Sequence, residues 1–220
     1  MNENKKQVKT RMLLVDDHEM IRRGLRGFID IESDLDVCAE AGSAQDALAQ
    51  CSKSNPDIAL IDLSLGEDSG LDLIKDMAVQ FPNIKMLVVS MQNEQLYAER
   101  VLRAGASGFV AKDSSQPELV NAIRCVLTGK IYASPLIAQR IMTSVRQSLS
   151  SNPLEALSDR ELAVFERIGK GAGTAEIAEA MSLSIKTIET YRSRIKVKLN
   201  IQSSSELMQR AVQWSIVEQS

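Results

Sequence analysis

The chain has 220 residues, of which 44% are hydrophobic and 25% are charged, and its formal net charge is −3. This length suits one large domain or two modest ones, and the apolar content suffices for a folded core and argues against disorder over most of the chain. The slightly acidic net charge by itself predicts no nucleic-acid partner. The charge is unevenly distributed: residues 1–135 have 15 basic and 20 acidic side chains, a net charge of −5, whereas residues 136–220 have 11 and 9, a net charge of +2.

Neither a membrane segment nor a disulfide framework is indicated. No apolar run reaches the roughly 18 residues that a bilayer span needs, and residues 1–10 are polar and basic with no apolar stretch behind them. The three cysteines, Cys38, Cys51 and Cys125, are odd in number and far apart. Their spacing favours reduced, buried side chains over a metal or redox site. We therefore expect a soluble, cytoplasmic protein without a membrane partner.

Short apolar runs alternate with amphipathic helical patterns in the first half of the chain. The runs fall at residues 12–15, 35–39, 58–63, 84–89 and 108–111, and the helical patterns at residues 18–31, 44–53, 70–80, 94–104 and 116–128. Strands that alternate with helices of this length indicate right-handed βαβ units on a parallel sheet. Five units predict an α/β, flavodoxin-like (βα)5 fold with a five-stranded parallel sheet, which binds ligands at the carboxyl ends of its strands.

After residue 129 the strand patterns stop. Ser134-Pro135 predicts the start of a helix that runs to about residue 147, and the polar residues 148–152 ahead of Pro153 predict a linker. The chain is thus predicted to consist of a first domain at residues 9–131, a linker with a helical segment at residues 132–153, and a second domain at residues 154–220.

The second domain is predicted to be an all-α domain of four helices. Residues 158–161 and 203–206 both read Ser-x-x-Glu ahead of an apolar period. This is the capping box, in which the serine and glutamate side chains accept hydrogen bonds from each other's backbone amides. Two further helical patterns, at residues 174–181 and 184–199, lie between them and are joined by the short turn Ser182-Leu183.

Polar side chains follow four of the five predicted strands. Asp16 and Asp17 end the first strand, Asp62 ends the third, Ser90 follows the fourth and Lys112 follows the fifth. Converging carboxylates repel each other, and a hard cation such as Mg²⁺ relieves that repulsion. The metal would neutralise an incoming phosphoryl group, with Asp62 as the nucleophile that forms an acyl phosphate. One such residue alone would be read as a helix cap facing water, but five at one edge indicate a site.

The helical pattern at residues 185–199 has two contrasting faces when it is placed at 100° per residue. Ile188, Tyr191, Ile195 and Leu199 fall on one face, the core side. Short polar residues flanked by bases lie opposite, an arrangement that suits a recognition helix in the major groove of double-stranded DNA. For this helix taken alone, an ordinary amphipathic helix with a solvated basic face is an equally good interpretation.

Four segments of the first domain resemble the receiver domain of two-component response regulators over about residues 11–130. The resemblance implies that Asp62 accepts a phosphoryl group from a phosphohistidine of a sensor histidine kinase, with Lys112 and Ser90 beside it. It implies Mg²⁺ ligation by Asp17, Asp62 and the Ser64 backbone carbonyl, with Asp16 acting directly or through water. The matching segments are Leu13-Leu-Val-Asp-Asp-His, Asp57-Ile-Ala-Leu-Ile-Asp-Leu-Ser-Leu, Val88-Val-Ser and Gly108-Phe-Val-Ala-Lys-Asp.

Ser90 and Phe109 match the switch pair of that family. The resemblance implies that the Ser90 hydroxyl moves toward the phosphate and that the aromatic ring turns inward behind it. Two positions depart from the family pattern: Gly66 stands where proline is usual, and Ser69 stands where aspartate is common. Both lie in the loop after Asp62, so they bear on the rigidity of that loop rather than on the chemistry.

The second domain resembles the LuxR-type helix-turn-helix over about residues 154–215, which together with the receiver implies the NarL/FixJ class. The resemblance implies base contacts from Glu189, Thr190 and Ser193. Glu189 departs from the lysine that is often found there, and a glutamate can accept a hydrogen bond from cytosine N4. The matching segments are Leu157-Ser-Asp-Arg-Glu-Leu, Glu176-Ile-Ala-Glu-Ala-Met-Ser-Leu-Ser, Thr187-Ile-Glu-Thr-Tyr and Ile195-Lys-Val-Lys-Leu.

The same resemblance implies DNA-backbone contacts and a dimer. Lys186, Arg194 and Lys196 would bind phosphates, with Thr187 in the same interface. The last helix, at residues 206–217, resembles the helix that pairs two DNA-binding domains. The candidates for its dimer face, which are equally compatible with core positions, are Leu207, Arg210, Ala211 and Trp214.

These resemblances imply a phosphorylation-dependent transcriptional regulator, in which the receiver masks the recognition helix until Asp62 is phosphorylated and the released domains dimerise on DNA. It would not be an enzyme beyond slow self-phosphorylation and autodephosphorylation. A regulator of the same fold that ignores phosphate and responds to a ligand or protein is the alternative. A Mg²⁺-dependent phosphatase is disfavoured, because such hydrolases tend to need a second acid two residues after the nucleophile, where this chain has Ser64.

Overall fold

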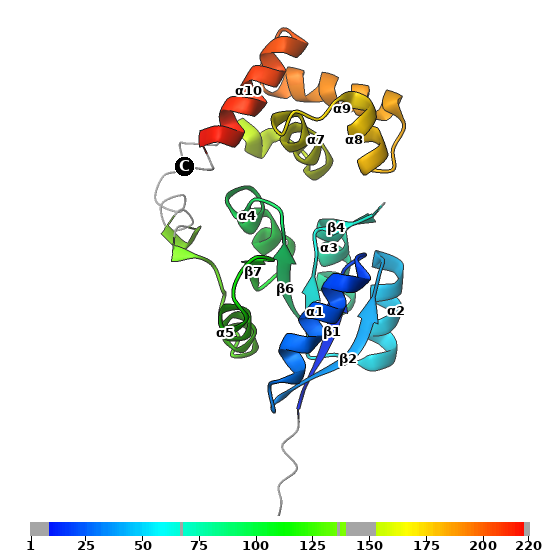
Figure 1. Ribbon diagram of the computed structural model, residues 1–220, viewed down its shortest axis with the longest axis vertical. Coiled ribbons are helices and arrows are strands. Elements are labelled where there is room, and N and C mark those ends of the chain that lie inside the picture. The colour runs from blue at the N-terminus through cyan, green and yellow to red at the C-terminus, as the bar shows by residue number, and fades with distance from the viewer. Residues whose placement is uncertain (1–8, 67, 136, 140–152, 218–220) are drawn as a thin grey trace, which may run out of the picture. The chain divides into compact units, whose positions relative to one another are not determined.

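The structure, a computed structural model, describes residues 9–66, 68–135, 137–139 and 153–217 (Figure 1). The chain divides into two compact units, residues 1–141 and 142–220. A helix begins at Pro135 as predicted, and the Ser134 hydroxyl accepts a hydrogen bond from the Ile137 amide at 3.3 Å. The predicted continuation of this helix to residue 147 and the predicted linker at residues 148–152 lie outside the described residues.

The first unit is built on a five-stranded parallel sheet with the order β2-β1-β3-β6-β7, which confirms the predicted flavodoxin-like arrangement. Val15 of β1 pairs with Ile61 of β3, and Ser90 of β6 pairs with Ala111 of β7, so the strands finish close to one another at a single edge. The strands are β1 (Thr10–Val15), β2 (Leu35–Ala41), β3 (Ile58–Ile61), β6 (Lys85–Ser90) and β7 (Gly108–Ala111).

Helices pack on both faces of this sheet, which explains why its strands read as continuous apolar runs. Leu60 and Val89 of the sheet belong to one buried cluster with Ile29 of α1 and Ile123 of α5. Helices α2, α3 and α4 pack in succession against one another. The helices are α1 (Glu19–Asp30), α2 (Ala44–Ser54), α3 (Gly70–Gln80), α4 (Glu94–Ala104) and α5 (Gln116–Leu127).

A small antiparallel hairpin, β4 (Ser64–Leu65) and β5 (Asp68–Ser69), follows β3 and was not predicted. Gly66 in its turn has φ +60°, a conformation that the ring of proline forbids. The Asp68 carboxylate accepts a hydrogen bond from the Ala44 amide at the start of α2 at 2.9 Å, and the Ser69 hydroxyl caps α3. The loop that contains the two departures from the family pattern is therefore anchored to two helices.

The second unit is all-α, as predicted. Ser158 and Glu161 form a capping box, with the Glu161 carboxylate accepting from the Ser158 amide at 2.7 Å. The second predicted capping box is incomplete: Ser203 caps the Glu206 amide at 3.1 Å, but the Glu206 carboxylate bonds the Gln202 amide instead. The helices are α7 (Asp159–Gly169), α8 (Thr174–Ala180), α9 (Ile185–Lys198) and α10 (Ser204–Val217), preceded by the short 3₁₀ helix η1 (Pro153–Ala156).

Within the described part of the chain, no helix is both long and apolar enough to cross a membrane.

All three cysteines are free thiols, but only Cys51 is fully buried, whereas Cys38 and Cys125 are half-buried. Burial raises the pKa of the Cys51 thiol to about 11, so this side chain is uncharged at neutral pH. The expectation of buried thiols is therefore met in full by Cys51 alone.

Candidate functional site

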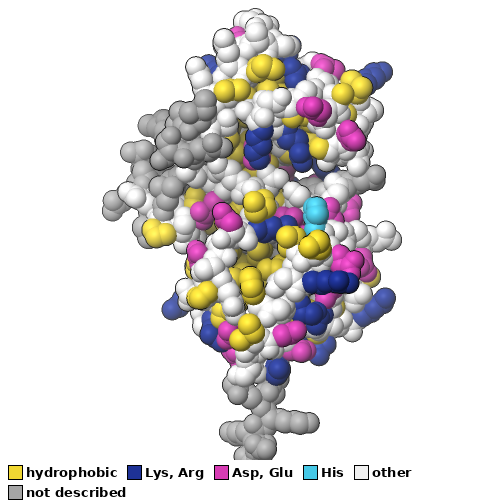
Figure 2. Space-filling view, in the orientation of Figure 1, with side chains coloured by type: hydrophobic (Ala, Val, Ile, Leu, Met, Phe, Trp, Pro, Cys, Tyr) yellow, Lys and Arg dark blue, Asp and Glu magenta, His cyan; other side chains and the backbone are white. Residues whose placement is uncertain are grey.

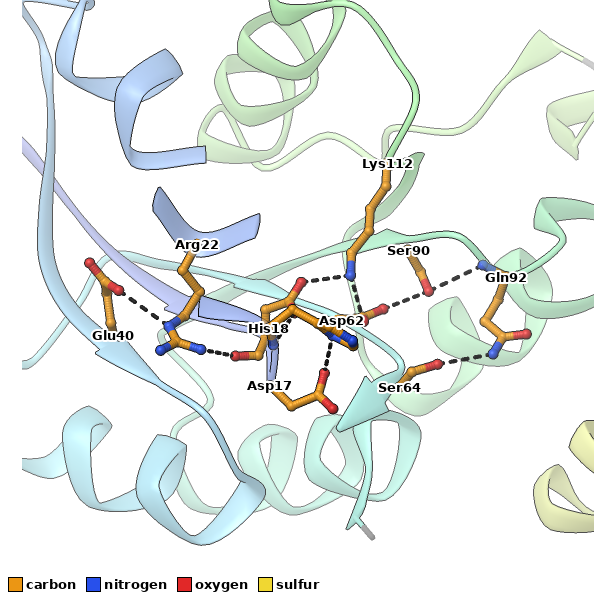
Figure 3. Close-up of polar contacts among 10 residues, drawn as sticks. Asp17, His18, Arg22, Glu40, Asp62, Ser64, Ser90, Gln92 and Lys112 are labelled. Carbon is orange, nitrogen blue, oxygen red and sulfur yellow. Dashed lines mark hydrogen bonds and ion pairs between the residues drawn. The ribbon is translucent and has the colours of Figure 1, made fainter. Parts of the chain in front are cut away.

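The carboxyl edge of the sheet brings four of the five predicted side chains into one buried cluster (Figure 3). Asp62, which follows β3 and is 3% exposed, lies at its centre. The Ser90 hydroxyl donates to Asp62 Oδ1 at 2.7 Å, and Lys112 Nζ donates to Asp62 Oδ2 at 2.6 Å. Each carboxylate oxygen of Asp62 thus has a donor from a different strand end.

Asp16 is the second buried acid of the cluster and is 1% exposed. Its Oδ1 accepts a hydrogen bond from the His18 amide at 2.9 Å, and its Oδ2 lies 2.6 Å from Lys112 Nζ. Lys112 therefore bridges Asp16 and Asp62. Burial opposes the positive charge of Lys112, but the two carboxylates outweigh burial and hold the pKa of Lys112 above its ordinary value.

Asp17 lies at the rim of the cluster, where its side chain is 28% exposed. Its Oδ1 atom contacts Nδ1 of His18 at 2.7 Å, and the His18 side chain is 67% exposed. His18 is the only histidine of the chain, and it is visible at the surface beside acidic side chains (Figure 2). No catalytic role was predicted for His18. Its contact with Asp17 could be anticipated only from their adjacency in sequence.

The residues of this edge fit a divalent cation. The ligand atoms that Asp16, Asp17 and His18 can offer lie within 4.8 Å of one another. Asp16 Oδ2 is buried and, within the described residues, accepts no hydrogen bond of good geometry, although the Lys112 ammonium lies beside it. Carboxylate and carbonyl oxygens are the ligands that Mg²⁺ prefers. A hard divalent cation near Asp16 and Asp17 is consistent with this donor set.

The side chains of Gln92 and Ser64 also lie beside the cluster. The Gln92 side-chain amide donates to the Ser64 hydroxyl at 3.1 Å, and the Gln92 backbone amide donates to the Ser90 hydroxyl at 3.3 Å. Phe109, the other predicted switch residue, is 1% exposed, and it pairs with Val88 across β6 and β7. The ring is therefore buried while Ser90 is bonded to Asp62.

Helix α9 exposes most of the side chains that were predicted to read DNA. Three of its predicted core residues, Ile188, Ile195 and Leu199, are buried, and Tyr191 is half-buried. Ser184 caps the helix by accepting from the Thr187 amide at 3.1 Å. Thr187 and Lys196 are half-buried, and the exposed members of the predicted set are Lys186, Glu189, Thr190, Ser193 and Arg194.

Two contacts orient this helix within the second unit. The Glu189 carboxylate accepts a hydrogen bond from the Thr174 hydroxyl of α8 at 3.1 Å. Near the other end of α9, Lys198 Nζ lies 2.6 Å from the buried Glu161 carboxylate of α7. Burial alone would raise the pKa of Glu161, but Lys198 and the Ser158 amide outweigh burial and hold this pKa below its ordinary value of 4.5.

Glu161→Gln is expected to lower the free energy of unfolding of the second unit by about 2 kcal/mol at pH 7, because a buried charged hydrogen-bond acceptor is lost. A carboxylate whose pKa is depressed on folding stabilises above its unfolded-state pKa, and this stabilisation disappears as the pH falls through the folded-state pKa. The gap between wild type and variant should therefore close below about pH 4. Urea unfolding followed by the fluorescence of Trp214, the only tryptophan, measures the gap; a gap that stays constant with pH contradicts the prediction.

The four candidates for a dimer face on α10 separate into two pairs. Leu207 and Ala211 are buried within the unit, so their side chains serve its core. Arg210 is exposed and donates to the Leu199 carbonyl at 3.1 Å. Trp214 is half-buried, with its ring centroid 6.3 Å from that of Phe165. The core interpretation that the sequence left open therefore applies to Leu207 and Ala211.

A flavodoxin-like unit with two buried aspartates and a bridging lysine, followed by a helix-turn-helix unit, defines the class of two-component response regulators. Comparison with protein families agrees with this. The family described as "Response regulator receiver domain" matches residues 12–124, and the family described as "Bacterial regulatory proteins, luxR family" matches residues 155–211. The chain belongs to the NarL/FixJ-type response regulators, which have a receiver domain and a LuxR-type DNA-binding domain.

Similar proteins include three bacterial regulators that match along most of their length. The chain is 35% identical to the response regulator GacA of Pseudomonas viridiflava, over 96% of this chain and 99% of that protein. It is 34% identical to the response regulator UvrY of Escherichia coli K12, over 91% of this chain and 93% of that protein. It is 32% identical to the oxygen regulatory protein NreC of Staphylococcus epidermidis, with coverage of 94% and 99%.

Solved structures show the same fold. A LuxR-family two-component response regulator from Aurantimonas sp. SI85-9A1 is 34% identical and has a TM-score of 0.58, with coverage of 63% of this chain and 99% of that one. The response regulator RcsB of Salmonella typhimurium has a TM-score of 0.64 at 21% identity, and the match covers 94% of this chain and 98% of that one. At that identity, RcsB supports the fold alone.

Proposed function

We propose that this protein is a phosphorylation-dependent transcriptional regulator that accepts a phosphoryl group on Asp62 from a sensor histidine kinase. The observation that carries the proposal is the surroundings of Asp62: a buried carboxylate with a hydroxyl donor at 2.7 Å and an ammonium donor at 2.6 Å. These donors match the oxygens of a phosphoryl group as well as they match the carboxylate. We expect no turnover beyond slow self-phosphorylation and autodephosphorylation.

In the reaction, a carboxylate oxygen of Asp62 attacks the phosphorus of a phosphoimidazole on the kinase. An O–P bond forms, the N–P bond breaks, and the imidazole leaves with the electron pair. Asp16, Asp17, Asp62 and the Ser64 carbonyl would hold Mg²⁺, which when bound neutralises charge on the transferring group. As negative charge passes from the Asp62 carboxylate to the phosphoryl oxygens, the Lys112 ammonium turns from the carboxylate to these oxygens.

The transferred group then acts on the switch pair. The Ser90 hydroxyl, which donates to Asp62 Oδ1, exchanges this acceptor for a phosphoryl oxygen. Phe109 is buried, and we expect phosphorylation to favour this inward arrangement of its ring. A local charge change that biases a two-state element is a general mechanism of switching.

The response is carried by the second unit, which we propose binds the major groove of DNA as a homodimer. Glu189, Thr190 and Ser193 would face base edges, and Lys186, Arg194 and Lys196 would bind phosphates with Thr187 beside them. The exposure of most of these side chains on one helix supports this. Structures of RcsB are described as bound to the promoter rprA in the presence of the phosphomimetic BeF3-, and as two dimers bound to two parallel DNAs.

The proposal is tested by measuring DNA affinity with and without a small acyl phosphate and Mg²⁺, for wild type and for Asp62→Asn. A phosphodonor-dependent gain that is confined to the wild type is expected, because asparagine cannot form the acyl phosphate. Equal binding in all four conditions would show DNA binding that is independent of phosphate, and control would then lie with a ligand or a protein partner.

A further inference from the structure

Arg22 of α1 reaches from the helix to the backbone of the acidic cluster (Figure 3). Its Nη1 atom donates a hydrogen bond to the Asp16 carbonyl oxygen at 2.5 Å. Its Nε atom donates to the Glu40 carboxylate of β2 at 3.2 Å. The Arg22 side chain is only 16% exposed, so its position is determined by these two partners and not by water.

The carbonyl group that Arg22 binds is the point at which β1 leaves the sheet. The Asp16 amide still donates to the Ala41 carbonyl at 3.1 Å, but β1 itself ends at Val15. A buried carbonyl beyond the end of a strand needs another donor, and Arg22 supplies it. The peptide plane between Asp16 and Asp17 is rigid, so fixing this carbonyl fixes the backbone from which the Asp17 side chain projects.

Asp17 depends on that backbone more than Asp16 does. The Asp16 side chain is buried and held by Lys112 and the His18 amide. The Asp17 side chain is partly exposed at the rim, where its partner is the exposed imidazole of His18. Its direction is therefore governed mainly by the orientation of the Asp16–Asp17 peptide.

Glu40 completes the chain of contacts, and its second partner, Arg26, provides an internal control. One oxygen of its carboxylate accepts from Arg22, and the other lies 2.7 Å from Nη2 of Arg26. Arg26 lies one helical turn beyond Arg22 on α1, so it shares the same carboxylate while its guanidinium is directed at Glu40. Removal of Arg26 changes the ion network but keeps the hydrogen bond to the Asp16 carbonyl.

We propose that Arg22 is a positioning residue that holds the Asp16–Asp17 peptide so that the Asp17 carboxylate is oriented to bind Mg²⁺. This inference rests on the proposed function, because it assumes the divalent-cation site. Outer-shell groups that orient metal ligands typically change metal affinity by 10–100-fold when they are removed. Arg22 is such a group, acting through the backbone.

The test is a calorimetric titration of the full-length protein with Mg²⁺. Arg22→Met keeps the alkyl packing and removes the donors, so we expect its Mg²⁺ dissociation constant to rise about tenfold. Arg22→Lys, which can reach the Asp16 carbonyl but cannot also bind Glu40 through a second nitrogen, should recover part of the affinity. Arg26→Met, the matched control, should stay within about twofold of wild type because it lacks the backbone contact.

Unfolding in EDTA separates a positioning role from a merely structural one. A structural role would lower the stability of both methionine variants without metal and leave Mg²⁺ affinity unchanged, which would overturn the inference. Phosphorylation of Arg22→Met by a small acyl phosphate should return to the wild-type rate when Mg²⁺ is raised about tenfold, since the chemistry at Asp62 is intact. If wild type itself binds no Mg²⁺ at millimolar concentrations, the proposed function fails first; if wild type binds it and Arg22→Met binds it equally well, only this inference fails.

Discussion

Lys112→Met should lower the free energy of unfolding of the receiver unit by about 3 kcal/mol when Mg²⁺ is chelated, because breaking a buried ion pair leaves its charges uncompensated. The ammonium of Lys112 lies 2.6 Å from an oxygen of Asp16 and 2.6 Å from an oxygen of Asp62. Both carboxylates are almost fully buried, so water cannot replace the lost cation. Urea unfolding followed by far-ultraviolet circular dichroism in EDTA measures the loss.

Mg²⁺ provides the second half of this prediction. A divalent cation bound near Asp16 and Asp62 replaces part of the missing positive charge, so the variant should gain more stability from Mg²⁺ than wild type does. Its DNA affinity should no longer respond to the phosphodonor, because the phosphoryl oxygens lack their ammonium partner. Lys130→Met, which removes an exposed lysine after α5, is the control and should change stability by no more than about 0.5 kcal/mol. A Lys112 variant as stable as this control would contradict the prediction.

Much of the cluster was predictable because parallel strands carry polar residues to a common edge. Asp62, Ser90 and Lys112 each follow an apolar run, and the topology of the sheet then brings them together without any knowledge of side-chain geometry. The same rule does not separate Asp16 from Asp17, which are adjacent in sequence. Which of the two points inward is set by contacts with Lys112 and His18 that exist only in the folded unit.

Other features depend on tertiary partners that a local pattern does not contain. Arg22 bonds Glu40 across 18 positions of the chain. The helical period places Arg22 on the same face of α1 as the buried Leu25, but it does not identify the residue that Arg22 bonds. On α10, apolar spacing gave Leu207 and Ala211 as either core or dimer residues, since both kinds of surface are apolar and follow the helical period. Only their burial against the other helices of the unit separates the two interpretations.

Gly70→Ala is expected to destabilise the receiver unit by about 3 kcal/mol, because a methyl group must be forced into a space that backbone already occupies. A Cβ atom at this position would lie 2.1 Å from the Asp62 carbonyl oxygen and 2.6 Å from the Leu63 Cα atom. Neither is the end of a flexible side chain, so relief requires the backbone of Asp62 to move. The Gly70 amide also donates to the Leu63 carbonyl at 3.1 Å, which holds the two segments together.

The backbone that must move belongs to the phosphoacceptor Asp62, so the stability and the phosphoryl uptake of Gly70→Ala should decrease together. Gly24→Ala is the matched control: it lies within α1, a Cβ atom there meets nothing within 4 Å, and alanine in an exposed helix stabilises by roughly 0.5–1 kcal/mol relative to glycine. Urea unfolding and phosphoryl incorporation from an acyl phosphate measure the two effects. If Gly70→Ala matches wild type in both measurements, the Asp62–Leu63 backbone can shift without consequence. The close approach to Gly70 would then play no part in holding Asp62 between Ser90 and Lys112.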